Sequence, residues 1–127
     1  MLFSFKKWLK SCFYAIEGIK YAFRQQNFVL ITIIAFLAIG LGFVLKISYF
    51  EWLILILTIA SVLSLEAFNT VWEKTMDFVE PSIFKKVKDI KDMAAGAVLI
   101  FCFFSLIIGA IIFLPKIIPL LTGLKLY

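Results

Sequence analysis

The sequence predicts an all-α integral-membrane protein, with an amino-terminal helix at the membrane interface followed by three transmembrane helices. Hydrophobic residues make up 64% of the 127 residues, and the mean hydropathy is +1.07. Both values exceed those of ordinary soluble domains. Three apolar runs also have lengths within the range of about 17–25 residues that a helix needs to cross a membrane. The whole chain, residues 1–127, is expected to form a single membrane domain.

The first predicted element, over residues 1–27, is an amphipathic helix. Between residues 3 and 26, apolar and charged side chains alternate at helical spacing. One face carries Phe5, Trp8, Leu9, Cys12, Phe13, Ile16, Ile19 and Phe23, and the other carries Lys6, Lys7, Lys10, Glu17, Lys20 and Arg24. A helix with these two faces is typical of a membrane surface, where apolar side chains enter the lipid and lysines meet the headgroups.

Three apolar runs follow, and each is predicted to be a transmembrane helix. They cover residues 28–45, 52–72 and 93–115. A short polar hairpin from Lys46 to Glu51 joins the first two, with aromatic side chains beside it at the level of the membrane surface. Pro115 and Lys116 are expected to close the third.

A charged connection is predicted between the second and third runs, from Glu80 to Asp92, with Pro81 as a helix breaker. It contains a basic cluster of Lys85, Lys86, Lys88 and Lys91. Lysine and arginine are more frequent here and in the amino-terminal helix than in the first hairpin. The positive-inside rule therefore predicts that the amino terminus and this connection are cytoplasmic in a multi-pass membrane protein.

Composition also excludes several functions. The formal net charge is +5, but the lysines lie beside apolar runs and no nucleic-acid-binding module is visible, so a nucleic-acid partner is not expected. The sequence has no histidine, which excludes His-based triads and zinc sites. Cys12 and Cys102 lie in unrelated segments without metal-binding spacing and are interpreted as reduced apolar side chains.

An acidic stripe marks the end of the second apolar run. On a helix, Glu66, Asn69, Glu73 and Asp77 fall within an arc of roughly 80°, and an ionisable residue inside a spanning helix is by default a candidate functional residue. Three interpretations remain open at this point. In the first, the stripe holds magnesium and a polyanion together with the nearby lysines; in the second, it lines a pore or proton path; in the third, it makes structural contacts between helices. The phosphate-binding patterns GxxxxGK[ST] and GxGxxG are absent.

The residues themselves indicate a family. Glu66-Ala-Phe-Asn69-Thr-Val-Trp-Glu73, then Asp77, then Lys91-Asp92-Met-Ala-Ala-Gly-Ala-Val, resembles the prokaryotic-type diacylglycerol kinase family, small three-span membrane kinases that include the undecaprenol kinases. The family pattern is E-x-x-N-T/S-x-x-E-x-x-x-D, followed after a connection by K-D-x-x-A/S-A-A-V. The resemblance extends to the basic amino-terminal helix with Ala15, Gly18 and Lys20, and to the pair Asn27-Phe28.

The resemblance implies a homotrimer in the bacterial inner membrane, with sites between subunits that transfer the γ-phosphoryl group of ATP to a lipid hydroxyl at the cytoplasmic face. It implies that Glu66 is the general base, that Asn69 positions the reactants and that Glu73 binds the Mg²⁺ that bridges ATP. The implied nucleotide-binding residues are Lys7, Tyr14, Gln25, Glu73, Asp77, Lys91 and Asp92, and the implied metal ligands are Glu73 and Gln25. The sequence does not choose between diacylglycerol and undecaprenol, because the groove that would select them is built from generic Phe, Leu and Ile.

Two departures from the family pattern stand out. Many members have an acidic metal ligand shortly before the Asn-Phe pair, whereas this chain has Gln25 and Gln26 in a segment one residue shorter, with Gln25 as the equivalent. A neutral amide there is expected to change metal affinity or stoichiometry. Pro81-Ser-Ile-Phe84 also replaces a Tyr-His pair found in many members. The alternative function is a non-catalytic helical membrane interaction module on the same scaffold, and the complete polar set argues against it.

Overall fold

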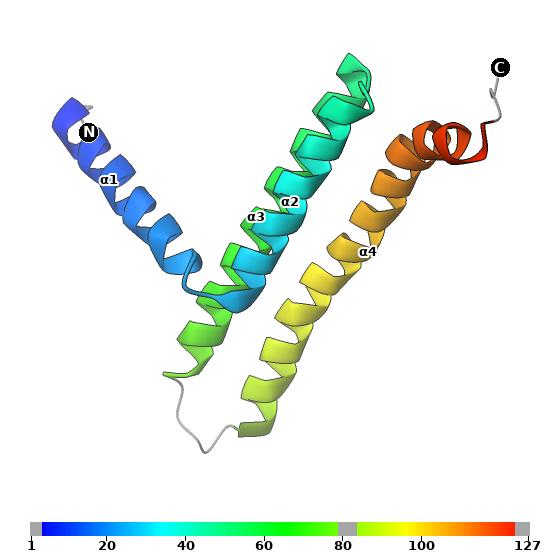
Figure 1. Cartoon of the computed structure of the whole chain (residues 1–127). Helices are drawn as coiled ribbons and strands as arrows, with labels where there is room; N and C mark the ends of the chain where they lie inside the picture. Colours follow the sequence, from blue (N-terminus) through cyan, green and yellow to red (C-terminus); the bar gives the residue numbers. More distant parts are fainter. Residues whose placement is uncertain (1–3, 79–83, 124–127) are drawn as a thin grey trace.

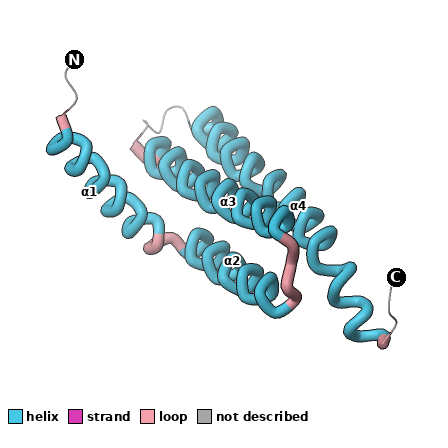
Figure 2. Tube along the Cα trace, turned by 90° about the horizontal axis from the view of Figure 1, so that it is seen from above, coloured by secondary structure: helices cyan, strands magenta, loops and turns pink. Residues whose placement is uncertain are grey.

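The computed structural model describes residues 4–78 and 84–123, and the regular elements in these ranges are helices (Figures 1 and 2). They are α1 (Phe5–Ala22), α2 (Gln26–Val44), α3 (Tyr49–Met76) and α4 (Phe84–Thr122). Three stretches are long and apolar enough to cross a membrane: α2, α3 and Lys85–Thr122 of α4. The predicted all-helical class with three candidate spans is thus confirmed.

Helix α1 diverges from the other three helices (Figure 1). Its large apolar side chains remain uncovered in the single chain: Phe5 is 61% exposed, Phe13 60% and Ile19 56%. The helix ends at Ala22, and the backbone N–H of the next residue, Phe23, donates to the Ile19 carbonyl at 3.2 Å. A membrane surface or a second protein surface would cover such a face, and the interfacial placement of residues 1–27 stays a prediction.

A tight turn joins α2 to α3. The backbone N–H of Ile47 donates to the Gly42 carbonyl at 3.1 Å, and that of Lys46 donates to the Phe43 carbonyl at 3.3 Å. This is the Schellman pattern that closes many helices, usually with glycine at the left-handed position. Here Lys46 occupies that position with φ 49°. A side chain in this conformation costs about 1 kcal/mol relative to a right-handed one.

Helix α3 begins with a capping box formed by Ser48 and Glu51. The Ser48 hydroxyl accepts the Glu51 backbone N–H at 3.3 Å, and Glu51 Oε2 accepts the Ser48 backbone N–H at 2.6 Å. The other carboxylate oxygen, Glu51 Oε1, accepts a hydrogen bond from Lys116 Nζ at 2.5 Å. This ion pair connects the α2–α3 hairpin to the distal part of α4.

Helix α3 packs against both α2 and α4. The compact part of the core lies near the hairpin and consists of Ile47, Leu55, Ile112 and Phe113. Many other large apolar side chains are exposed, which suits helices surrounded by lipid, because hydrocarbon solvates these side chains as well as a protein core does. An apolar crevice of about 500 Å³ remains between α2, α3 and α4.

The start of α4 corrects one prediction. The helix begins at Phe84, so the basic cluster lies on helical turns and not in an irregular connection reaching Asp92. Pro81, the predicted breaker, lies outside the described residues. From Lys85 onward the sequence contains no proline or glycine before Gly96, and lysine is a good helix former, so nothing local opposes the helix.

The end of α4 corrects a second prediction. Pro115 was expected to close the element, but the helix continues to Thr122 with Pro115 and Pro119 inside it. Figure 1 shows that the end of α4, drawn in orange to red, turns away from the direction of the rest of the helix. Proline causes such bends because it lacks an N–H and its ring displaces the carbonyl of the preceding turn.

Candidate functional site

Three polar side chains of α3 are buried near its carboxyl-terminal end. Glu66 is 4% exposed, Asn69 6% and Thr70 5%, and the spacing of three and four residues places them on one helix face. Within the described part of the chain, Asn69 Oδ1 is buried without a hydrogen-bond partner. Buried polar atoms are normally paired. A buried carboxylate beside an unpaired amide oxygen therefore marks this face as the candidate site.

The corner between α1 and α2 lies against this face. Phe28, in the first turn of α2, is 7% exposed, and its ring meets that of Phe23 edge-on with centroids 5.1 Å apart. This aromatic contact braces the corner. The side-chain amide of Asn27 interacts with the Glu66 carboxylate. Sequence reasoning did not assign Asn27 to the site, because a contact between two helices leaves no periodic signal in either one.

Two further groups lie near the Glu66 carboxylate. Glu73, half-buried and two turns further along α3, is close enough for charge repulsion between the two carboxylates. Cys102, on α4, is close enough for its thiol to be affected by the charge of Glu66. Glu66 is therefore surrounded by groups from α2, α3 and α4. Both Cys102 and Cys12 are free thiols.

An ion pair joins the end of α3 to the beginning of α4. Lys91 Nζ lies 3.0 Å from Oδ1 of Asp77, the residue that follows the last turn of α3. The hydrogen bond from Lys91 holds the pKa of the Asp77 carboxyl below its usual value, and the positive charges of Lys91 and Lys74 act in the same direction. Exposed ion pairs contribute little to stability. The pair instead holds a carboxylate and an ammonium group together at the end of the helices where the candidate site lies.

The structure brings together most of the predicted site residues, but not all of them. Helix α3 presents Glu66, Asn69 and Glu73 and is followed by Asp77, and the first turns of α4 present Lys91 and Asp92. Gln25 lies at the α1–α2 corner, where its side chain makes no capping hydrogen bond. Lys7 and Tyr14 lie on the exposed surface of α1, which diverges from the other helices (Figure 1). In a single chain these two residues stay apart from Glu66.

The oxygen donors of the site suit magnesium. Within the described residues, no group of three or more acidic, cysteine or histidine side chains is placed to hold a metal ion. Mg²⁺ needs few protein ligands, however, and commonly completes its shell with water and substrate phosphates. The half-buried carboxylate of Glu73 and the amide oxygen of Gln25 are donors of the type that such an ion accepts.

The fold and this site define a small multi-span membrane protein with a buried carboxylate centre near one end of its helices. The model of the prokaryotic diacylglycerol kinase family matches residues 13–113. The chain belongs to this family and is thus a membrane lipid kinase of the prokaryotic type. The matched range includes every predicted site residue except Lys7.

Several relatives show the same membership. The chain is 38% identical over 112 residues to the undecaprenol kinase of Bacillus subtilis, covering 87% of this chain and 91% of that protein. It is 36% identical over 107 residues to a diacylglycerol kinase of Helicobacter pylori, covering 83% and 84%. It is 35% identical over 111 residues to the diacylglycerol kinase of Synechocystis, covering 86% and 63%. No solved structure matches.

Proposed function

We propose that this chain transfers the γ-phosphoryl group of ATP to the hydroxyl of a membrane lipid at the cytoplasmic face. The acceptor is undecaprenol or diacylglycerol, the two lipids that appear in the names of its relatives. The observation that carries the proposal is the burial of Glu66, 4% exposed, on the same α3 face as Asn69. It supplies a proton acceptor inside a spanning helix near its end, where the hydroxyl of a lipid would lie.

The reaction needs one proton acceptor and accurate positioning. The Glu66 carboxylate takes the hydroxyl proton as the lipid oxygen attacks the γ-phosphorus. The bond between that phosphorus and the bridging oxygen breaks, ADP leaves with the electron pair, and the proton passes from Glu66 to water. The amides of Asn27 and Asn69 orient the carboxylate and the hydroxyl. A positioned base typically contributes about 10²- to 10⁴-fold in rate, and phosphoryl transfer draws the rest mainly from positioning and charge stabilisation.

The nucleotide is held by the remaining polar residues. Glu73 and Gln25 would hold Mg²⁺, which supplies neutralisation of the phosphate charges when bound. Lys91 donates to Asp77 at 3.0 Å, and a phosphate oxygen would compete with Asp77 for the same ammonium. The adjacent Asp92 is exposed on the first turns of α4, where it would complete the surroundings of the metal and nucleotide.

We place each site between subunits of a homotrimer. Lys7 and Tyr14 lie on α1, whose apolar face is uncovered, and they are separated from Glu66 of the same chain. In a trimer, α1 of one subunit would bring these two residues to the site of its neighbour. The apolar crevice between α2, α3 and α4, about 500 Å³, adds a further surface on which a neighbouring helix would pack.

The proposed orientation is cytoplasmic for the amino terminus and the site. It rests on the lysines of α1 and of the first turns of α4, since positively charged residues are retained on the cytoplasmic side. A reporter fused after Tyr127 should then read the opposite side, because three spans separate the two termini. A cytoplasmic reading there would overturn the arrangement.

The decisive assay measures transfer from radiolabelled ATP to undecaprenol and to diacylglycerol in one detergent. Glu66→Gln is expected to reduce turnover about 10²- to 10⁴-fold while retaining ATP binding. Glu51→Gln is the matched control, because it makes the same change on the same helix at the opposite end, and it should remain active. Equal activity of the two variants would remove Glu66 from the chemistry. Transfer to neither lipid by the folded wild type would favour the interaction module.

A further inference from the structure

A second groove lies at the end of the molecule opposite to the candidate site, between the α2–α3 hairpin and the bent end of α4. It has a volume of about 470 Å³ and is lined by side chains from both. The hairpin contributes Val44, Leu45 and Lys46, and α4 contributes Lys116, Pro119 and Leu120, with Gly123 directly after the helix. The part from α4 lies beyond residues 13–113, which match the family. The proposed kinase reaction uses none of these residues.

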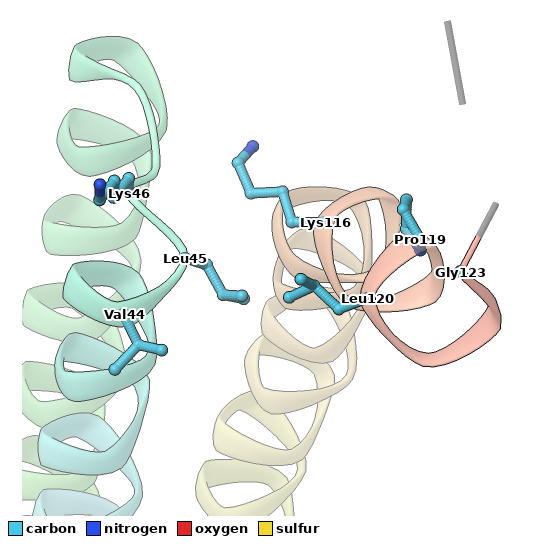
Figure 3. A pocket seen from close by; sticks show the side chains of 7 residues that line it. All are labelled: Val44, Leu45, Lys46, Lys116, Pro119, Leu120 and Gly123. Atoms are coloured by element: carbon cyan, nitrogen blue, oxygen red, sulfur yellow. The ribbon is translucent and has the colours of Figure 1, made fainter. Parts of the chain in front are cut away.

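The groove is polar at its outer rim and apolar deeper inside. In Figure 3, the ammonium group of Lys116 lies at the outer level, and that of Lys46 lies at a similar level but points away from α4. Val44, Leu45 and Leu120 lie deeper, with Leu45 and Leu120 on facing walls. Cations above apolar walls match a molecule that carries an anionic group directly above hydrocarbon. A free anion in water would gain nothing from the apolar level.

The charge balance fixes the class of anion. Lys116 is already paired with Glu51, so the two lysines and this carboxylate together carry a net charge of one. That charge complements a single phosphodiester. The position of Lys46 supports a role in binding, since φ is 49° at a place where glycine closes most such turns. Side chains kept in sparsely populated conformations are enriched at functional positions.

We propose that this groove binds the headgroup of an anionic phospholipid, in the membrane leaflet opposite to the candidate site. The phosphodiester lies beside Lys116, where the exposed side chain of Lys46 turns to reach it, and the first acyl carbons contact Leu45 and Leu120. A bound lipid would bridge the hairpin and the bent end of α4, next to the contact made by Glu51.

The test uses the fluorescence of Trp52. The centroid of its ring lies 4.7 Å from that of Phe43, and Phe43 precedes Lys46 by about one helical turn. In the variant Trp8→Phe, Trp72→Phe, emission comes from Trp52 alone. Brominated phosphatidylglycerol and brominated phosphatidylcholine with identical acyl chains are compared as quenchers in mixed micelles. A lysine near the membrane surface contributes about fivefold in preference for an anionic lipid. Phosphatidylglycerol should therefore be preferred about fivefold or more, and soluble glycerol 3-phosphate should not compete with it.

Variants of the groove residues distinguish a specific lipid-binding site from a general attraction of anionic lipids to the basic protein. Lys46→Gln and Lys116→Gln should each reduce the preference several-fold, whereas Glu51→Gln should increase it by releasing the charge of Lys116. Lys10→Gln, on α1, is the matched control and should leave it unchanged. Equal quenching by the two lipids, or an equal loss in the control, would overturn the proposal, as would displacement by glycerol 3-phosphate. Native mass spectrometry of the wild type and Lys46→Gln gives a second reading, in which equal retention of phosphatidylglycerol contradicts the site.

Discussion

Replacing Gly42 with alanine should destabilise the α2–α3 hairpin. A Cβ atom at this position would lie 2.9 Å from Cη2 and 3.1 Å from Cζ2 of Trp52, and 3.1 Å from Cδ1 of Ile47. The end of Ile47 can rotate away, but the indole of Trp52 is a rigid ring packed against Phe43. Overpacking of this kind costs about 1–3 kcal/mol. Removing a glycine from a helix interior returns up to about 1 kcal/mol, so the expected net loss is about 0–2 kcal/mol.

Gly40→Ala, on the same helix, is the matched control. A Cβ atom there meets nothing within 4 Å, so only the gain in helix propensity remains, about 0.5–1 kcal/mol. The two variants should therefore differ by about 1–3 kcal/mol. SDS titration of the purified proteins in mixed micelles, followed by far-UV circular dichroism, measures this difference. The packing described for the hairpin would be refuted if Gly42→Ala were as stable as Gly40→Ala.

Three further predictions concern the site. Glu73→Gln should raise the concentrations of Mg²⁺ and ATP needed for half-maximal activity, with partial rescue by excess Mg²⁺, because it removes a charged ligand; unchanged titrations would argue against metal binding by Glu73. Gln25→Glu should lower the Mg²⁺ requirement and Gln26→Glu should not, and coincident curves would place neither glutamine near the metal. Because the pKa of Asp77 is depressed in the folded protein, the unfolded state binds more protons near pH 4, and the Lys91–Asp77 pair stabilises the fold above that pH. Its contribution, which is small for an exposed pair, should be lost as the pH falls from about 5 to 3, so wild type should lose slightly more stability than Asp77→Asn over this range, and parallel stability curves would contradict this.

The sequence predicts the features that depend on one helix at a time. Long apolar runs indicate spanning helices, and the spacing of Glu66, Asn69 and Glu73 places them along one helix of the site. Contacts between helices leave no such signal. The interaction of Asn27 with Glu66, and the pairing of Lys116 with Glu51 across 65 positions of sequence, depend on how the helices pack.

The start and the end of α4 both differ from the prediction, and both differences have local causes that rules based on proline and charge do not capture. Charged residues after a proline suggest an irregular connection, but lysine favours a helix once Pro81 has been passed. A proline such as Pro115 usually marks the end of a helix. Here α4 continues past it, and the helix accommodates the proline by bending. The position of Lys7 and Tyr14, away from Glu66 in a single chain, was also not visible in the helical pattern.

The uncovered crevice between α2, α3 and α4 has a consequence for how the protein is handled. If neighbouring subunits fill it, the folded form is stabilised by association, and that stabilisation follows mass action. Inside a micelle or bilayer the relevant concentration is the number of protein chains per detergent or lipid molecule, not per volume of water. Adding empty micelles at constant protein should then lower both the unfolding midpoint and the activity, whereas adding buffer should not.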